Sequence, residues 1–394
     1  MRLLPLLACL ILAAPLQAQV QPPATVAVRF DLETITPVVA EGLADRSTGR
    51  AVTADDPVRV ASISKLVTAL GVMRLVEQGK LDLYRDVSDY LGWQLRNPSF
   101  PDKPIRLRDL LVHQSSLVDG GELYLIPLGT TLRERLRDPR VWSTSHPPAS
   151  GWFEYTNLNF PVIGSVIERV TGERFDIAMD RLVFRPLKLD ACFNWGAGCS
   201  EEAVKRAVVL YRASGEVARD DLKAQRPACL VFTETPSCDL STYQPGENGG
   251  LFSPQGGLRI SMRSLARLGQ VLARRDLRFL SPYSYSIMTG SHWLLDGKNG
   301  VGEDGTASGF FCDYGLAVQA LGNPRPGCND DLFKDRKYRL GHAGEAYGLR
   351  SGLWWSPITG QGIAFFTTAV PDDEPKGRSA FSAREESVVE RAGF

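Results

Sequence analysis

A serine and a lysine three residues apart, Ser62 and Lys65, have the types and the spacing that covalent chemistry could use. Three residues make about one turn of a helix, so the two side chains would share a face of a helix that begins near Ser62. A serine hydroxyl is a poor nucleophile until a base takes its proton, and a lysine whose pKa is lowered by partial burial can be that base. The pair therefore predicts acyl transfer through Ser62. Because Ser-x-x-Lys is expected about once by chance in a chain of this length, the alternative is a surface serine and lysine on an ordinary helix.

Two further motifs downstream could complete such a site. Tyr155-Thr156-Asn157 stands immediately before a helix that we predict from Pro161, on a loop from which a phenol and an amide could project into a cleft. Gly341-His342-Ala343-Gly344 stands directly before a predicted pair of strands. Taken singly, Tyr155 would be a half-buried packing residue and His342 a structural histidine. The motifs gain their meaning from occurring together and in this order.

The order Ser-x-x-Lys, Tyr-x-Asn, His-x-Gly resembles the motif set of the serine β-lactamase and penicillin-binding-protein superfamily, which includes class C β-lactamases, D-alanyl-D-alanine peptidases, D-aminopeptidases and β-lactamase-like esterases. The flanks are similar too. Residues 58–61 look like the family's lead-in to the serine, residues 105–113 like its lower helix, and residues 249–251 with 265–267 like another family stretch. The resemblance covers roughly residues 38–370, with the cysteine-rich middle poorly matched.

The resemblance implies three catalytic roles. Ser62 would be the nucleophile, and Lys65 would be its base partner. Tyr155 would be the second group that transfers protons, because its phenol could protonate the leaving group and then activate the water that releases the acyl group. Each of these residues occupies the position of the family motif in this chain.

The same resemblance implies how a substrate would be held. Asn157 would position the substrate amide, and His342 would line the substrate side of the cleft. The oxyanion hole would consist of two backbone N–H groups, those of Ser62 and of Glu345, which directly follows Gly344.

The chain departs from the best-known members of the family at His342. β-Lactamases and most penicillin-binding proteins have lysine there, and a neutral imidazole holds a substrate carboxylate less firmly than an ammonium does. We therefore do not expect efficient antibiotic hydrolysis, and branches with histidine at this place resemble esterases or D-amino-acid peptidases. Glu345 could bind a substrate ammonium if its side chain faced the cleft. A solvated or structurally paired carboxylate is the alternative that we favour.

The elements that would position these residues can be predicted from periodicity. Residues 26–60 alternate apolar and polar side chains, which predicts two or three antiparallel strands. Apolar residues at helical spacing after Ser62 predict a helix with one core-facing stripe and an end at Gly79. Further elements are predicted as a helix from Pro161 to Gly172, a hairpin of residues 350–355 and 363–370, and a last helix over residues 379–392.

Strands near both ends of the chain, with helices between them, predict an α+β fold in which one antiparallel sheet is built from both chain ends and flanked by helices. The α/β lobe would span about residues 25–82 and 285–394, and a mainly helical lobe, about residues 83–284, would be inserted into it. A cysteine-rich insertion with little periodicity occupies about residues 190–245. Together with the resemblance, this predicts a β-lactamase/transpeptidase-like catalytic domain over residues 25–394.

The start of the chain is typical of an exported protein. Arg2 precedes an apolar run to residue 14, and small residues before position 19 predict a signal peptide over residues 1–18. Its removal leaves six cysteines, an even number that favours disulfides in a periplasmic or secreted protein. Six cysteines allow 15 connectivities. The shortest loops would pair Cys192 with Cys199, Cys229 with Cys238 and Cys312 with Cys328.

The composition argues against several partners and cofactors. Lys plus Arg and Asp plus Glu both total 45, so no net charge favours nucleic acid or an anionic membrane. Neither the histidines nor the cysteines have the spacing of metal ligands, and we expect no metal and no cofactor. No later segment is long and apolar enough to be a transmembrane helix. The absence of Gly-x-Ser-x-Gly counts against an α/β-hydrolase.

These observations predict an exported serine hydrolase that cleaves an ester or amide in a small molecule or peptide, including D-amino-acid peptides. The alternatives within the family are a D-Ala-D-Ala carboxypeptidase and a weak β-lactamase, either of which would meet peptidoglycan fragments or their analogues. A different class of protein would bind penicillin or peptidoglycan through the same serine without turnover, as a sensor. A non-enzymatic extracellular scaffold is the remaining alternative.

Overall fold

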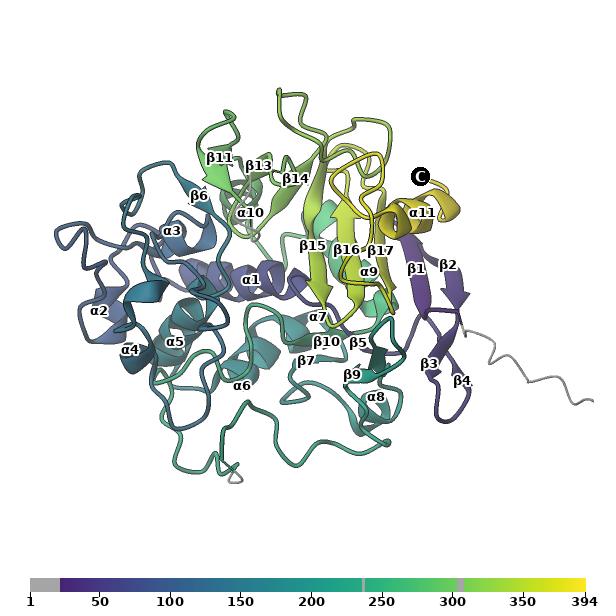
Figure 1. Ribbon diagram of the computed structural model, residues 1–394, viewed down its shortest axis with the longest axis horizontal. Coiled ribbons are helices and arrows are strands. Elements are labelled where there is room, and N and C mark those ends of the chain that lie inside the picture. Colours follow the sequence, from purple (N-terminus) through teal and green to yellow (C-terminus); the bar gives the residue numbers. More distant parts are fainter. Residues whose placement is uncertain (1–21, 236–237, 303–307) are drawn as a thin grey trace, which may run out of the picture.

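The computed structural model describes residues 22–235, 238–302 and 308–394. The predicted signal peptide, residues 1–18, lies outside these ranges. Within them, no helix has both the length and the apolar character needed to cross a membrane. One large sheet, a group of helices beside it and long connecting segments make up the described chain (Figure 1).

The large sheet is antiparallel and joins both ends of the described chain, which confirms the predicted α+β fold. Strand β1 (Thr25–Phe30) pairs on one side with β2 (Ile35–Glu41) and on the other with β17 (Gly362–Thr367). From β17 the sheet continues in the order β16, β15, β14, β13 and β11. These strands span Leu349–Trp355, Arg339–Ala346, Gln319–Leu321, Asp313–Tyr314 and Trp293–Leu294.

The two faces of this sheet contribute to separate hydrophobic cores, because successive side chains of a strand point to opposite faces. Val26 belongs to the larger core, which also contains residues of α9 (Met262–Ala273), whereas Ala27 belongs to the smaller core with residues of α11 (Ala383–Arg391). Figure 1 shows α9 and α11 near β16 and β17. Burial on both faces explains why β17 consists of apolar residues almost throughout.

Helix α1 (Ile63–Glu77) begins with the first motif and lies beside the sheet (Figure 1). The sequence predicts one core-facing stripe, but the helix is buried on nearly all sides, with Ser64, Lys65 and Thr68 at 0% exposure. The reason is that α1 packs between β15 and β16 on one side and helical elements on the other. Those elements are α6 (Phe175–Met179), the π-helical turn η2 (Asp180–Phe184) and α10 (Pro282–Thr289).

The other predicted helices are present with shifted ends. Helix α5 (Asn159–Thr171) begins two residues before Pro161 and ends, as predicted, at Gly172 in a left-handed conformation. Helix α11 begins after Ser382 rather than at residue 379, because Ser382 and Glu385 form a capping box. The short helices are α2 (Ser88–Leu91), α3 (Leu107–Leu111), α4 (Leu132–Arg135), η1 (Pro139–Val141), α7 (Arg185–Leu187) and α8 (Glu201–Lys205).

The region before α1 contains more strands than the two or three predicted. A hairpin, β3 (Leu43–Asp45) and β4 (Arg50–Ala51), follows β2, and β5 (Val58–Arg59) precedes Ser62. Strand β5 pairs with β10 (Leu258–Ile260), which pairs with β7 (Ala191–Phe193). This small sheet ties the cysteine-rich part of the chain to the strand that leads into α1. The remaining pairs join β6 (Phe153–Glu154) with β12 (Gly300–Val301), and β8 (Leu210–Tyr211) with β9 (Val217–Arg219).

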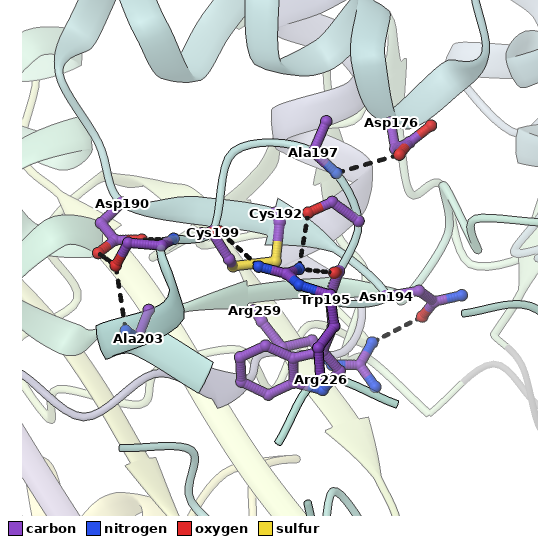
Figure 2. Close-up of a disulfide and its surroundings, with 12 residues drawn as sticks. Asp176, Asp190, Cys192, Asn194, Trp195, Ala197, Cys199, Ala203, Arg226 and Arg259 are labelled. Carbon is purple, nitrogen blue, oxygen red and sulfur yellow. Dashed lines mark hydrogen bonds between the residues drawn. A yellow bond between two sulfur atoms is a disulfide. The ribbon is translucent and has the colours of Figure 1, made fainter. Parts of the chain in front are cut away.

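Three disulfides confirm the predicted pairing of neighbouring cysteines. They join Cys192 with Cys199, Cys229 with Cys238, and Cys312 with Cys328. Figure 2 shows the first of them, beside the side chains of Trp195, Arg226 and Arg259. Because Cys192 belongs to β7, this disulfide lies two strands away from β5.

Candidate active site

Ser62 stands between strand β5 and helix α1. The residue before it, Ala61, has a positive φ of 47°, a conformation that costs free energy for a residue with a β-carbon and that occurs often at functional sites. The N–H groups of Ile63 and Ser64 donate to the carbonyl oxygens of Val60 and Ala61 and close the turn. Ser62 itself lines a cleft. The turn therefore presents the serine at the start of a buried helix.

Lys65 reaches Ser62, as the spacing predicts. Its Nζ atom donates to Oγ of Ser62 at 2.9 Å, to Oδ1 of Asn157 at 2.7 Å and to the carbonyl oxygen of Gln255 at 3.1 Å. The lysine side chain is fully buried, so oxygen acceptors of the protein replace its hydration. The alternative of a solvated lysine on an ordinary surface helix therefore does not apply, and Nζ lies in position for direct proton exchange with Oγ.

Asn157 connects Lys65 to a buried carboxyl group that no sequence motif indicates. Its Nδ2 atom donates to Oδ2 of Asp119 at 2.9 Å, and Oδ1 of Asp119 accepts the N–H of Leu158 at 2.9 Å. Burial raises the pKa of Asp119, although the hydrogen bonds from Leu158 and Asn157 and the charge of Lys65 oppose this effect. The sequence predicts that Asn157 positions the substrate. In the structure its amide binds Lys65 and Asp119, and Asn157 is not among the described residues that line the cleft.

Tyr155 lies in the cleft wall between two rings. Its ring stacks on His113 and on Phe311, with ring centroids 4.5 Å and 4.6 Å apart. Nζ of Lys65 lies 4.8 Å from the centre of the Tyr155 ring. The stacking fixes the plane of the phenol close to the lysine, and the cleft brings Ser62 and Tyr155 together. The three residues predicted to be catalytic therefore form one cluster.

His342 lines the cleft, although only 1% of its surface is exposed. Nδ1 is 2.6 Å from the carbonyl oxygen of Ala343, and Nε2 is 2.8 Å from the hydroxyl of Tyr314. Burial and the charge of Lys65 lower the pKa of His342 to about 3, so the imidazole is neutral at physiological pH. The sequence predicts that His342 lines the substrate side. The residue does line the cleft, but both ring nitrogens are engaged within the protein.

Gly344 allows β15 to pass directly beside the serine. A β-carbon at this position would lie 2.3 Å from the carbonyl oxygen of Val60 and 3.2 Å from the backbone nitrogen of Ser62. Any larger residue would therefore push the strand away. Strand β14 pairs with β15 only as far as Gly341, and the residues that follow line the cleft. This approach suits the predicted oxyanion hole, in which the N–H groups of Ser62 and Glu345 would act together.

The side chain of Glu345 forms an ion pair with Arg350, which stands opposite it on β16. Both residues line the cleft, and the Glu345 side chain is 69% exposed whereas that of Arg350 is 15% exposed. A carboxylate paired in this way has the structural role that we predict for Glu345 from the sequence. A substrate ammonium would have to compete with Arg350 for Glu345.

The cleft encloses about 300 Å³. Phe310, Phe311 and Phe381 give it an apolar wall, and the segment before α11 supplies much of its charged rim. The charged lining residues are Glu345, Arg350, Asp372, Glu374, Lys376 and Glu385. Within residues 22–235, 238–302 and 308–394, no three metal-binding side chains come together. The arrangement suits acyl transfer with an apolar group bound beside the serine.

Three residues of this cluster are not predicted from the sequence as site residues: His113, Asp119 and Tyr314. The polar run Gln114-Ser115-Ser116 follows His113 directly after α3, and this run is the signal that could have drawn attention to the segment that ends at Asp119. His113 also has a positive φ of 59°, and its ring stacks on that of Tyr155. Tyr314 belongs to a two-residue strand and has no comparable signal.

Comparison with known sequences identifies relatives of this chain. The family described as "Beta-lactamase" matches residues 14–385. Esterase EstB of Burkholderia gladioli is 35% identical over 230 residues, which are 53% of this chain and 57% of the esterase. Penicillin-binding protein 4 of Amycolatopsis lactamdurans is 27% identical over 286 residues, which are 69% of this chain and 72% of that protein. The chain thus spans little more than half the length of the esterase.

Solved structures have the same fold. The D-amino acid amidase from Ochrobactrum anthropi SV3, complexed with L-phenylalanine, superposes with a TM-score of 0.65 at 18% sequence identity. The superposition covers 94% of this chain and 92% of the amidase. The class C beta lactamase from Rhodobacter sphaeroides superposes with a TM-score of 0.65 at 17% sequence identity, and the superposition covers 94% of this chain and 93% of the lactamase. These likenesses confirm the predicted β-lactamase/transpeptidase-like fold.

Proposed function

Because the chain belongs to the β-lactamase family, we propose that it is an exported serine hydrolase that forms an acyl-enzyme on Ser62 and hydrolyses an ester or an amide. The observation that carries this proposal is the hydrogen bond of 2.9 Å between Nζ of Lys65 and Oγ of Ser62, beside a cleft of substrate size. A buried amine next to a serine hydroxyl can serve as its base. Tyr155 supplies a second proton-transfer group within the same cluster.

In the proposed reaction, Lys65 first gives up one proton of its ammonium group, and the resulting amine takes the Oγ proton while Ser62 attacks the carbonyl carbon of the substrate. The oxygen of the tetrahedral intermediate accepts hydrogen bonds from the N–H groups of Ser62 and Glu345. The bond to the leaving group breaks, and that group takes the proton of the Tyr155 hydroxyl. Water then gives a proton to the Tyr155 oxygen and attacks the acyl carbon, the ester bond to Ser62 breaks, and Oγ recovers its proton from Lys65.

The charges of the cleft favour a leaving group without a carboxylate. A D-alanyl-D-alanine carboxypeptidase releases an amino acid that carries one, and the family's lysine at this place would attract it. Here His342 is neutral, with Nε2 bound to Tyr314, and Arg350 is paired with Glu345. The aromatic wall suits alkyl or aryl groups instead. We therefore propose neutral esters or amides as substrates, with D-amino-acid amides as the narrower candidate class that a solved relative's name suggests.

Labelling and turnover test this proposal together. A fluorophosphonate probe, followed by mass spectrometry of peptides, should modify Ser62 in the wild-type protein and leave Ser62→Ala unmodified. In a panel of substrates, aryl esters and D-amino-acid amides should be hydrolysed at least about tenfold faster than D-Ala-D-Ala peptides or nitrocefin, because tenfold corresponds to one lost charged contact. A wild-type protein without an adduct at Ser62 would disprove the acyl-enzyme mechanism.

A sensor that uses the same serine is the competing function. Its acyl group would stay on Ser62, whereas a hydrolase releases it. Intact-mass measurements after brief exposure to an aryl ester separate the two, because the hydrolase should return to its unmodified mass within minutes. An adduct that persists for hours would favour sensing.

Export to the periplasm or the medium is part of the proposal. It is supported by three disulfides, which persist in oxidising compartments and are rare in the cytosol. Amino-terminal sequencing of the protein from the native host should find a mature chain that begins near Gln19. A protein recovered with residues 1–18 still attached would contradict the predicted cleavage.

A further inference from the structure

The hydroxyl of Tyr314 lies between two imidazoles, one of which, His342, lines the cleft. It is 2.8 Å from Nε2 of His342 and 3.4 Å from Nε2 of His113. All three side chains are buried, with exposures of 0% to 1%. The proposed acyl transfer uses none of these polar atoms. A buried polar group that lacks a partner costs free energy, so the three groups must satisfy one another.

The neighbouring groups decide which nitrogen of each imidazole carries the proton. Nδ1 of His113 accepts the N–H of Thr156 at 3.0 Å, so in the neutral ring the proton is on Nε2. Nδ1 of His342 faces the carbonyl oxygen of Ala343 at 2.6 Å, and a carbonyl only accepts, so Nδ1 carries that proton. Tyr314 must then donate to Nε2 of His342 and accept from Nε2 of His113.

Both imidazoles are neutral because of their surroundings. Burial and the nearby charge of Lys65 lower the pKa of each ring, that of His342 to about 3 and that of His113 well below its usual value. The hydrogen bonds therefore run in one direction, from His113 to Tyr314 to His342 and finally to the carbonyl group of Ala343. Each contact in this series of hydrogen bonds has one donor and one acceptor. Reversing the direction of one hydrogen bond would leave two donors or two acceptors facing each other.

The same chain of hydrogen bonds fixes Tyr155 in two ways. The ring of His113 stacks on that of Tyr155 with an interplanar angle of 29°, and Nδ1 of His113 holds the backbone N–H of the next residue, Thr156. A rotation of His113 would break both contacts. The hydroxyl of Tyr314 opposes such a rotation because it accepts from the far side of the same ring.

We propose that Tyr314 is a positioning residue of the reaction, whose hydroxyl holds His113 and His342 in opposite tautomers and so fixes the phenol of Tyr155 beside Lys65 and Ser62. The inference rests on the proposed function, since it assigns Tyr314 a part in proton transfer through Tyr155. The same role accounts for a histidine rather than a lysine at position 342. The Nε2 atom of His342 serves the internal chain and not the substrate.

Nitrogen-15 NMR of the wild-type protein tests the hydrogen-bond chain directly. The sequence contains four histidines, so His146→Gln and His292→Gln variants would assign the spectrum. We expect neutral rings with the proton on Nε2 of His113 and on Nδ1 of His342 throughout the range of pH in which the protein is folded and active. The opposite tautomer at either ring, or a charged His342 at pH 6, would overturn the proposal.

Turnover of an aryl ester tests the positioning role. Tyr314→Phe keeps the ring but removes the hydroxyl, and we expect kcat to fall about tenfold with KM changed less than about twofold. Tyr285→Phe is the matched control, because Tyr285 is also buried and its hydroxyl accepts a hydrogen bond from Trp355 at 3.2 Å, outside the cleft. It should keep the wild-type kcat. A Tyr314→Phe variant with wild-type kcat would refute the positioning role, whereas failure of the proposed function would appear separately, as an unlabelled Ser62 in the wild-type protein.

Discussion

The catalytic centre and the disulfide-tied segment, which we define as residues 192–257, are held in place by different means. In the centre, Lys65 and Tyr155 are 0% and 5% exposed and belong to elements that pack into the main core. The disulfide-tied segment has few regular elements, and most of its residues between 212 and 247 are exposed or half-buried. Packing over many residues fixes the first region. The ends of the second region pack in hydrophobic clusters as well, but its more exposed part depends more on individual contacts.

These contacts are polar and covalent. Arg226 donates to the carbonyl oxygens of Trp195 and, at 2.9 Å, of Cys199 beside the first disulfide (Figure 2). Asp220 forms an ion pair of 2.9 Å with Arg259 of β10, and both side chains are at most 5% exposed. Buried charge pairs are strongly destabilising when one partner is removed. The exposed part of the disulfide-tied segment therefore depends on a few single residues for its stability.

The two regions meet where the disulfide-tied segment ends. The carbonyl oxygen of Gln255 accepts from Lys65, and the N–H of Leu258 donates to Oγ of Ser64 at 3.0 Å. The lysine of the motif is therefore held partly by its own helix and partly by the disulfide-tied segment. Changes in the two regions should differ in kind, the first affecting chemistry and the second affecting stability, with overlap at this junction.

Lys65→Met should have the largest effect. Methionine has nearly the volume of the lysine stem but cannot accept a proton, so kcat should fall about 10⁴-fold while circular dichroism still shows a folded protein. Steady-state hydrolysis of an aryl ester measures the loss. Lys80→Met, at an exposed position just beyond α1, is the control and should keep wild-type activity. A Lys65→Met variant with more than about one hundredth of wild-type turnover would show that another group is the base.

Asp220→Asn should act mainly on stability. The change leaves the buried guanidinium of Arg259 without its carboxylate, close to that of Arg59, and we expect the free energy of unfolding to fall by about 3 to 5 kcal/mol in urea titrations. Asp221→Asn is the matched control, because Asp221 pairs with Lys223 at the surface and should contribute less than about 1 kcal/mol. Equal effects of the two changes would contradict the idea that single buried contacts hold the disulfide-tied segment.

Glu168 should make the attachment of the disulfide-tied segment to α5 sensitive to pH. It is fully buried on α5 and accepts from the hydroxyl of Tyr243 and the N–H of Gly246. Burial raises the pKa of Glu168 to about 7 from an ordinary value of 4.5. The folded state therefore prefers the protonated form, and this contribution is complete below pH 4.5 and is lost as the pH rises to about 7.

The difference between the folded and the ordinary pKa of Glu168 corresponds to a loss of about 3 kcal/mol in the free energy of unfolding as the pH rises from 4.5 to about 7. Urea titrations at a series of pH values should show a decline that is larger by about this amount in the wild-type protein than in Glu168→Gln. Glu216→Gln, at an exposed position of the same segment, should decline like the wild type. A wild-type protein whose unfolding free energy rises relative to Glu168→Gln between pH 4.5 and 7 would contradict the expectation.

The sequence was sufficient for the parts of the molecule that depend on local pattern. Ser62 and Lys65 were predicted to meet because they lie one turn apart on a periodic helix, and the hairpin of the large sheet followed from alternation and a turn. The three disulfides also followed from short loops. These features need only neighbours in the sequence, and the family resemblance added the order of the motifs.

Features that depend on distant partners were not predicted. Asp119 acts on Lys65 through Asn157, and Tyr314 reaches His342 from a strand of two residues, so neither contact leaves a periodic signal. Full burial of α1 was missed for the same reason, since it results from packing between two parts of the chain. The course of the disulfide-tied segment is set by contacts such as Asp220 with Arg259, and sequence spacing does not encode these.

Two disulfides of the same segment offer the finest comparison, with the smallest expected effect. The sequence separations are seven residues for Cys192–Cys199 and nine for Cys229–Cys238. Replacing either pair by serine should lower the free energy of unfolding by a similar amount, about 2 kcal/mol, because the loops closed are of similar length. Stability alone would therefore not distinguish them.

Activity should distinguish them, because only the first disulfide is joined to the catalytic centre by strands. Cys192 pairs across β7 and β10 with Arg259, and Arg259 pairs with Arg59 just before the serine turn. At temperatures well below both unfolding transitions, removing Cys192 and Cys199 should lower kcat severalfold, whereas removing Cys229 and Cys238 should leave kcat unchanged. Equal losses of kcat would mean that the disulfide-tied segment supports Lys65 as a whole. No loss in either variant would mean that the hydrogen bond from Lys65 to the carbonyl oxygen of Gln255 depends on neither disulfide.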